Sequence, residues 1–371
     1  MYFLKSVFYS LLNLVYLGMF KKTIITAVAF SMAMSFTSFC NAQSDADKAV
    51  VLGKQATALE NKQDFTGAIK LLEQANKLDP QRLIYLYEAG YNYYSIKNYP
   101  QAIAILTPLM SRRDVTPNVF RVLGNSYDLI SDTPKALETF DAGIALFPAA
   151  GDLYLDAGGI HVDHDADSKA LGYFEAGIKN APAFPSNYYW AAKLYCNSDE
   201  RVNGLVYGEL FMNLERNSER STEMSKLLFD TYKQGITLMP GSQPVVDFSG
   251  QTAVSIAKGT SVVHTKLPFS FAYEPVMRIA FESETAVDLN SLDRARTKFL
   301  LNYHKLKMDA KYPNVLFNYQ EKILKAGYLS VYNHWLLMHG EEARFNEWEQ
   351  EHRDEWNAFL KWYNANPIKL A

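Results

Sequence analysis

The sequence predicts a mainly α-helical protein: an α-solenoid of about five helix-turn-helix repeats, followed by a smaller, mostly helical C-terminal region with short extended segments. One observation is a constant spacing of 34 residues between four alanines, Ala68, Ala102, Ala136 and Ala170. Another is a small residue twelve positions before each of them, at Ala56, Gly90, Gly124 and Gly158. A period of 34 residues is the length of one helix-turn-helix unit. The small residues are expected where two antiparallel helices cross closely.

The repeats also contain larger apolar side chains, and a proline usually follows the second helix. The first has Leu52 and Leu59, then Leu72 and Pro80; the third has Phe120 and Tyr127, then Phe140 and Pro148; the fourth has Tyr154 and His161, then Phe174 and Pro182. Proline after the second helix ends it, because proline cannot continue a helix. The second unit has Asp114 at the position of the closing proline, and Pro108 falls inside its second helix, which predicts a kink there.

At these residues the chain resembles the tetratricopeptide repeat family, whose pattern runs aromatic, Leu-Gly, Tyr, then Ala, Phe and a closing Pro. The resemblance covers residues 49–216. The fifth unit, with Tyr188, Ala192 and Tyr195 followed by Gly204, fits only in its first half. The resemblance implies a fold and a way of binding proteins, and it implies no catalytic activity.

The resemblance also implies where a partner binds, because in such repeats the first helix of each pair lines a concave groove. The residues predicted to point into the groove are Tyr87, Tyr91, Tyr94, Arg121, Asn125, Asp128, Tyr189 and Lys193. Tyrosines together with an arginine and an asparagine suit an extended peptide. Arg121 and Asn125 resemble half of the carboxylate clamp of chaperone-binding members, but Asp156 and Trp190 occupy the places of the other half. Ordinary surface or inter-repeat packing is the alternative for all of these residues.

The N-terminal segment, residues 1–42, reads as an extension followed by a secretory signal. Lys21 and Lys22 form its charged start, residues 24–36 its apolar stretch, and Ala42 ends a small-residue cleavage site. Met19 is then the expected start of translation rather than Met1. A membrane hairpin made with residues 6–20, or a lipid anchor through Cys40, is the alternative. We therefore expect an exported protein, in the periplasm or associated with the cell envelope.

Charge and cysteine content narrow the function classes further. Without Lys5, Lys21 and Lys22, the chain keeps 34 basic and 40 acidic residues, a net charge of about −6. The excess of acidic residues and the lack of a basic patch argue against a nucleic-acid partner. Removal of the signal leaves Cys196 alone, so no intramolecular disulfide or thiolate metal cluster can form. Cys196 is expected to act as a small buried hydrophobe rather than a nucleophile.

The C-terminal part changes its pattern after the repeats. A connecting helix within 217–240, capped by Ser221, is expected to lead into a region at 241–371. Three short runs, Val245–Phe248, Ser261–Val263 and Phe269–Tyr273, suggest strands or extended segments. Helices are expected at about 290–308, 314–338 and 341–364, and an aromatic stripe from Phe345 to Tyr363 predicts that the last two form a hairpin.

Several residues invite a chemical role without completing one. Asp163, Asp165 and Asp167 alternate as in a calcium loop, but Ser168 and Phe174 replace its glycine and its bidentate glutamate. His334 and His339 are five residues apart and do not share a helical face as zinc ligands do. No metal or cofactor is therefore expected.

Two functions from different classes remain. The first is an exported, non-catalytic adaptor that holds a protein or peptide segment in its groove, within an envelope-associated assembly. The second is an enzyme with an unrecognised site at 241–371, which predicts a pocket near His304, His334 or His339. A C-terminal region that caps the last repeat and dimerises is a narrower possibility.

Overall fold

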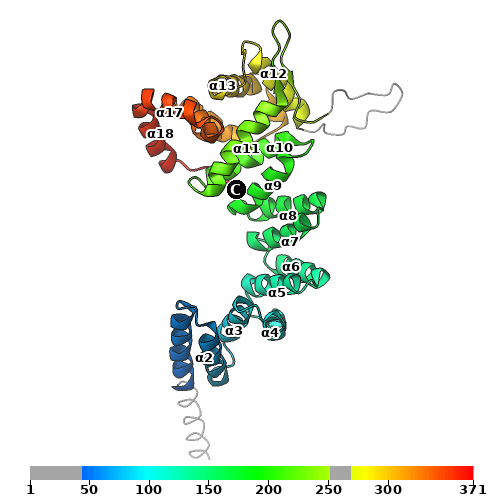
Figure 1. The fold of residues 1–371 in the computed structure, drawn as a ribbon, viewed down its shortest axis with the longest axis vertical. Helices are drawn as coiled ribbons and strands as arrows, with labels where there is room; N and C mark the ends of the chain where they lie inside the picture. The colour runs from blue at the N-terminus through cyan, green and yellow to red at the C-terminus, as the bar shows by residue number, and fades with distance from the viewer. Residues whose placement is uncertain (1–43, 251–268, 371) are drawn as a thin grey trace, which may run out of the picture. The chain divides into compact units, whose positions relative to one another are not determined.

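The computed structural model describes residues 44–250 and 269–370, in two compact units that meet in sequence between Ala136 and Leu137 (Figure 1). Helical residues 44–60 open the first unit. The elements that follow in this unit are α2 (Phe65–Leu78), α3 (Leu83–Ser95), α4 (Tyr99–Leu106), η1 (Thr107–Ser111) and α5 (Pro117–Leu129). Helix α6 (Thr133–Leu146) begins in the first unit and ends in the second.

The small residues of the 34-residue period lie in the core, as predicted. All four alanines of the second helices are fully buried, and so is Ala56. Gly90 and Gly158 show why the helices cross so closely. A Cβ atom on Gly90 would lie 2.6 Å from Leu106, and one on Gly158 would lie 2.3 Å from Phe174, sixteen residues later in both cases. These contacts leave no room for a larger residue, so the period reports helix-to-helix packing.

The turns inside the first four pairs share a second feature with the same period. Gln63, Lys97, Ser131 and Asp165 all have positive φ, between 53° and 64°. None is glycine, although a residue with a Cβ adopts this left-handed conformation at a cost of about 1–2 kcal/mol. The packing of the two helices therefore fixes a turn that the local sequence alone disfavours.

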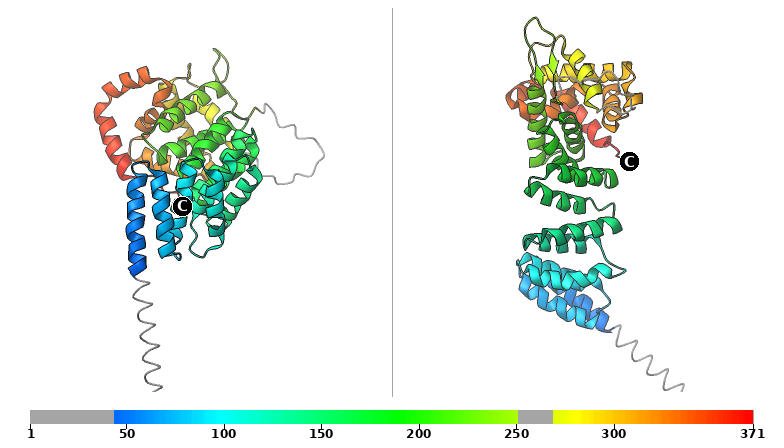
Figure 2. Two further views of the ribbon diagram at one scale, coloured as in Figure 1. Left: turned by 60° about the horizontal axis from the view of Figure 1, so that its bottom comes forward. Right: turned by 90° about the vertical axis from the view of Figure 1, so that its right-hand side faces the viewer.

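In the second unit the pairs continue with α7 (Gly151–Asp163), α8 (Asp167–Asn180), α9 (Pro185–Cys196) and α10 (Arg201–Leu214), which form successive layers in Figure 2. The fifth pair is complete, although its second half departs from the pattern. Gly204 takes the small-residue role in α10, because a Cβ there would lie 2.6 Å from the backbone nitrogen of Cys196. Cys196 is buried, and burial raises the pKa of its thiol to about 11, which agrees with an inert packing residue.

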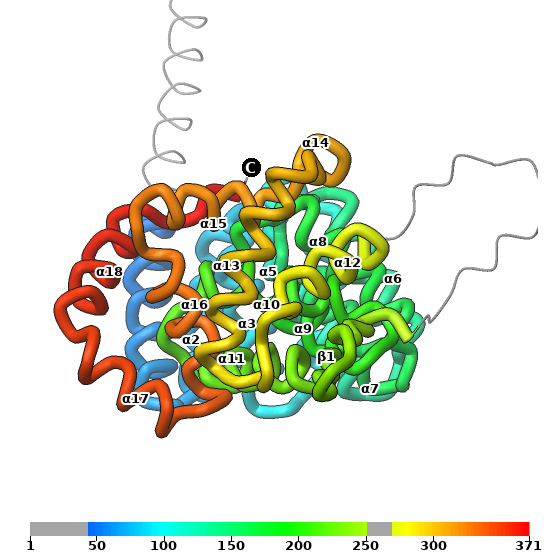
Figure 3. The backbone as a smooth tube through the Cα atoms, turned by 90° about the horizontal axis from the view of Figure 1, so that it is seen from above, coloured from blue at the N-terminus to red at the C-terminus, as the bar shows by residue number. Residues whose placement is uncertain are grey.

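The C-terminal part of this unit is helical around a two-stranded sheet. The sheet pairs β1 (Ile236–Thr237) with β2 (Val245–Val246) in antiparallel register. The helical elements are α11 (Glu219–Gly235), α12 (Ser270–Phe281), α13 (Leu289–Lys305), α14 (Met308–Lys311), α15 (Val315–Lys325), α16 (Leu329–Leu337), η2 (Met338–Gly340), α17 (Glu342–Glu351) and α18 (Arg353–Ala365). Figure 3 shows the bend between α17 and α18.

Several C-terminal expectations need correction. The run Phe269–Tyr273 leads into α12 rather than a strand, because Tyr273 packs against Phe299 and Phe248 in a helical core. The helix expected at 314–338 is two helices, separated at Gly327, whose φ of 84° is left-handed. The helix expected at 341–364 is also two, which meet at His352. The cap of α11 is Ser218, with Ser221 as its partner in a capping box.

Other expectations hold or lie outside the described residues. In the second repeat, the α-helix α4 ends at Leu106 and continues as a 3-10 turn through Pro108, in line with the predicted kink. The stripe on α18 packs on α16, where Tyr332 and Trp335 both contact the ring of Tyr363. The secretory signal and the run Ser261–Val263 lie outside the described residues. Within 44–250 and 269–370, no helix combines the length and hydropathy of a membrane span.

Candidate peptide-binding surface

Three of the predicted groove residues form an aromatic strip on one helix. Tyr87, Tyr91 and Tyr94 recur on α3 at four- and three-residue steps, and Tyr99 of α4 continues the row. The rings of Tyr91 and Tyr94 stack with centroids 6.5 Å apart, and those of Tyr94 and Tyr99 lie 5.7 Å apart. Tyr91 is 42% exposed, although it is a large aromatic residue. We call these four residues the tyrosine strip.

The next first helix, α5, carries the polar residues of the prediction. Arg121 is exposed, whereas Asn125 and Asp128 are half-buried. None of the three is free of partners among the described residues. Burial and the charge of Glu88 raise the pKa of Tyr87 to about 12, and the charge of Arg121 opposes this rise. Tyr87 therefore stays a neutral hydrogen-bond donor, within electrostatic reach of a cation from the neighbouring pair.

Tyr189 and Lys193 of α9 lie in a different setting. Tyr189 is buried, and its hydroxyl donates to a carboxylate oxygen of Glu223 on α11. Lys193 Nζ lies 2.7 Å from the other oxygen of Glu223 and above the rings of Tyr189 and Trp190. The sequence pattern did not reveal Glu223, because α11 follows the last repeat. The contacts show that this pair joins α9 to α11, and its part in binding a partner stays a prediction.

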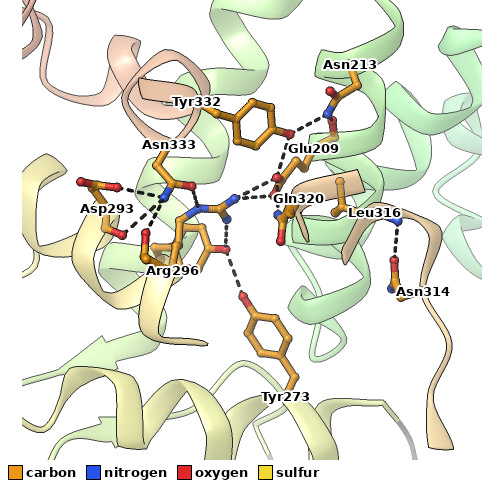
Figure 4. A network of polar contacts seen from close by, with 12 residues as sticks. Glu209, Asn213, Tyr273, Asp293, Arg296, Asn314, Leu316, Gln320, Tyr332 and Asn333 are labelled. Carbon is orange, nitrogen blue, oxygen red and sulfur yellow. Dashed lines mark hydrogen bonds and ion pairs between the residues drawn. The ribbon is translucent and has the colours of Figure 1, made fainter. Parts of the chain in front are cut away.

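A buried polar network that the sequence did not reveal joins α10, the last repeat helix, to the C-terminal helices (Figure 4). Arg296 of α13 donates from Nη2 to both oxygens of Glu209 of α10, at 2.8 and 2.9 Å. Gln320 and the Tyr332 hydroxyl also donate to Glu209, at 2.5 and 2.9 Å. Arg296 further donates to the hydroxyl of Tyr232 and the amide oxygen of Asn333. A buried ion pair is tolerated when its remaining donors and acceptors are satisfied in this way.

The network is closed to a substrate. Both charged side chains are almost fully buried, and the void beside them measures about 10 Å³, at the lower limit for one water molecule. Glu209 stands in an apolar stretch of α10, between Leu205 and Leu210, and a charge at such a place is the signal that predicts a buried partner.

The three histidines named for the enzymatic alternative each contact different neighbours. His334 is buried, lies 3.9 Å from Asp293 and stacks on Trp348 with ring centroids 4.0 Å apart. His304 pairs with Asp309, and His339 pairs with Glu342. Among the described residues, no group of three or more His, Cys, Asp or Glu side chains is placed to hold a metal ion, and this includes the acidic turn at 163–167.

Comparisons with known proteins add local similarities. No family model matches the chain. A stretch of 125 residues is 28% identical to the RanBP2-like and GRIP domain-containing protein 4 of Homo sapiens, and it covers 32% of this chain and 7% of that protein. The crystal structure of MamA covers 43% of this chain and 94% of its own, at 23% identity and a TM-score of 0.37. The structure of YrrB, described as a TPR protein with an unusual peptide-binding site, covers 50% and 94% at 18% identity and a TM-score of 0.35.

The chain thus spans a small part of its human relative, and the interpretation of its fold rests on its own helix pairs. These pairs have a 34-residue period and buried small residues at the crossings. A stack of this kind offers an extended surface for protein partners.

Proposed function

We propose that this chain, a tetratricopeptide repeat protein, is an exported, non-catalytic adaptor that holds an extended segment of a partner protein. The observation that carries the proposal is the tyrosine strip beside Arg121. Tyrosine offers a large, flat contact area with few rotatable bonds, and arginine supplies several donors in a fixed geometry. Such a surface matches a peptide that presents backbone carbonyls and apolar side chains.

Export is part of the proposal and rests on the sequence of the N-terminal segment. Lys21 and Lys22 before an apolar stretch, with Ala42 at its end, have the order of a secretory signal. The proposed setting is the periplasm or an assembly at the cell envelope. N-terminal sequencing of the mature protein tests this part: a first residue at or near Gln43 supports it, whereas an intact N-terminus contradicts it.

The binding role is tested by affinity capture from envelope extracts with two double variants. Tyr91→Ala/Arg121→Ala removes the exposed ring of the tyrosine strip and the cation beside it. Ile84→Ala/Arg113→Ala is the matched control, because it removes an exposed apolar side chain of α3 and an exposed arginine elsewhere in the same unit. We expect the first variant to lose a companion that the wild type and the control both retain. Equal recovery of every companion by both variants would remove the proposed surface.

A further inference from the structure

A second surface of the protein contains a hollow of about 850 Å³. Its walls come from α8 and α10, the second helices of the last two pairs, from Tyr188 of α9, from residues 312–315 at the start of α15, and from Phe269 and Leu370. The apolar and aromatic residues that define it include Ile178, Tyr188, Val206, Tyr207, Tyr312 and Val315. The hollow lies wholly within the second unit, whereas the tyrosine strip lies on α3 and α4 of the first unit.

The hydroxyl of Tyr188 marks this hollow as a binding site. Tyr188 is only 2% exposed, yet among the described residues its hydroxyl has no hydrogen-bond partner. Tyr188 is one of the residues that line the hollow. A buried polar group without a partner is uncommon in proteins, because it loses its bonds to water and gains none. Burial raises the pKa of Tyr188 to about 12, so the hydroxyl is a neutral donor near neutral pH.

The charge of the residues that line the hollow indicates which kind of group would accept a hydrogen bond from Tyr188. Lys179, near the end of α8, is the one charged side chain among the described residues of the lining, and it is exposed. Lys179 forms no ion pair with another described residue. The nearby tyrosines are used differently. Tyr207 donates to Glu175 at 3.2 Å, whereas no described residue accepts from the Tyr188 hydroxyl.

We propose that this hollow binds a small amphipathic carboxylate, with an aliphatic or aromatic body between the apolar walls and a carboxylate that accepts from the Tyr188 hydroxyl. Lys179 supplies the complementary positive charge in the same lining. The volume falls within the range of about 300–1,000 Å³ that is usual for small-molecule sites. Walls of apolar and aromatic side chains with a few polar groups are typical of such sites.

The first test titrates the full mature chain with dodecanoate by isothermal titration calorimetry. Dodecyltrimethylammonium is titrated in parallel, because it has the same apolar chain and a positive head group. We expect saturable binding of one dodecanoate per chain and no saturable binding of the cation. Absence of saturable dodecanoate binding, or equal binding of both probes, would overturn the proposal.

Variants then locate the site. Tyr188→Phe keeps the ring and removes the hydroxyl, so it should weaken dodecanoate binding about tenfold or more, as expected for a hydrogen bond to a charged group. Lys179→Gln should weaken it about two- to fivefold, because the lysine is exposed and screened. Val206→Trp should abolish binding by filling the hollow.

The matched control is Tyr328→Phe/Lys322→Gln, which makes the same chemical changes at residues that do not line the hollow. It should bind dodecanoate as the wild type does. Far-UV circular dichroism checks that every variant is folded. If Tyr188→Phe and Lys179→Gln are folded and bind as tightly as the wild type, dodecanoate occupies another place and the proposal fails.

Discussion

The repeat pairs and the C-terminal helices are held together by different means. In the repeats, small residues at fixed spacing let helices approach closely, and the contacts join residues near one another in the sequence, such as Gly158 and Phe174. Beyond the repeats, large aromatic side chains surround a buried ion pair that joins Glu209 of α10, the last repeat helix, to Arg296 of α13, 87 residues later. The difference teaches that a local, periodic core can be predicted from spacing, whereas a core built from distant partners cannot.

The strongest test of this comparison breaks the buried ion pair. Glu209→Gln leaves Arg296 buried without its counter-charge, which is expected to lower the free energy of unfolding by about 3–5 kcal/mol. Urea denaturation followed by circular dichroism measures the change. The double variant Glu209→Leu/Arg296→Met should recover only part of the loss, because it removes both charges but leaves Gln320 and Tyr332 without their acceptor. A single variant that costs less than about 1 kcal/mol would show that the network does not stabilise this region.

The repeat core is tested at two adjacent glycines of α7. Gly158→Ala places a methyl group against Phe174, and we expect it to destabilise the protein by about 1–3 kcal/mol through overpacking. A Cβ on Gly159 would meet no atom within 4 Å, so Gly159→Ala should stabilise the helix by about 0.5–1 kcal/mol. Thermal unfolding of the two variants gives the comparison. Equal effects of the same sign would contradict the close helix crossing.

The left-handed turns allow a smaller test. Lys97 is exposed and has a φ of 63°, so Lys97→Gly should relieve strain and raise the free energy of unfolding by up to about 1 kcal/mol. Part of the gain is offset, because glycine also makes the unfolded chain more flexible. Lys70→Gly, at an exposed position inside α2, is the control and should destabilise by about 1 kcal/mol. Chemical denaturation measures the free energy of unfolding of both variants. If Lys97→Gly loses as much stability as Lys70→Gly, the turn at Lys97 is not strained.

The smallest expected effect concerns His334 in the C-terminal core. Burial lowers its pKa below the usual 6.5, against the opposing influence of the Ser330 carbonyl and Asp293, while His352 lowers it further. The unfolded chain then binds the proton more readily than the folded one. This contribution to stability is therefore present above pH 6.5 and falls as the pH drops from that value toward the pKa in the folded protein.

The test compares unfolding free energies at about pH 7.5 and 5.5, a range in which histidine is the side chain that normally titrates. His334→Gln should show a smaller decrease with acidification than the wild type. His164→Gln, at an exposed histidine, is the control substitution, against which the decrease measured for His334→Gln is compared. If His334→Gln loses as much unfolding free energy on acidification as the wild type, His334 is not the group that makes the stability of this region depend on pH.

The sequence predicted the repeat region well for a physical reason. Each alanine or glycine at a crossing is constrained by a neighbour in its own pair. The 34-residue spacing is therefore enough to predict how the two helices pack. The run Phe269–Tyr273 was misread, because aromatic residues favour strands locally while burial against Phe299 favours the helix that forms. The break at Gly327 has a local signal, a glycine in the left-handed conformation just after α15, whereas the network around Glu209 depends on partners that no spacing indicates. Of the candidate surface, the tyrosine strip could be predicted from helical spacing, whereas the contact of Tyr189 with Glu223 could not.

A ladder of side-chain bonds also links neighbouring pairs in the second unit. Tyr173 donates to Asp141 at 2.9 Å, and 34 residues later Tyr207 donates to Glu175 at 3.2 Å. Under mechanical load such rungs would share the force between adjacent pairs, so extension should proceed in discrete steps, one pair at a time. A released repeat of 34 residues spans at most about 110–120 Å when fully extended. Tension along the stack would then lengthen the second unit pair by pair while its remaining pairs stay folded.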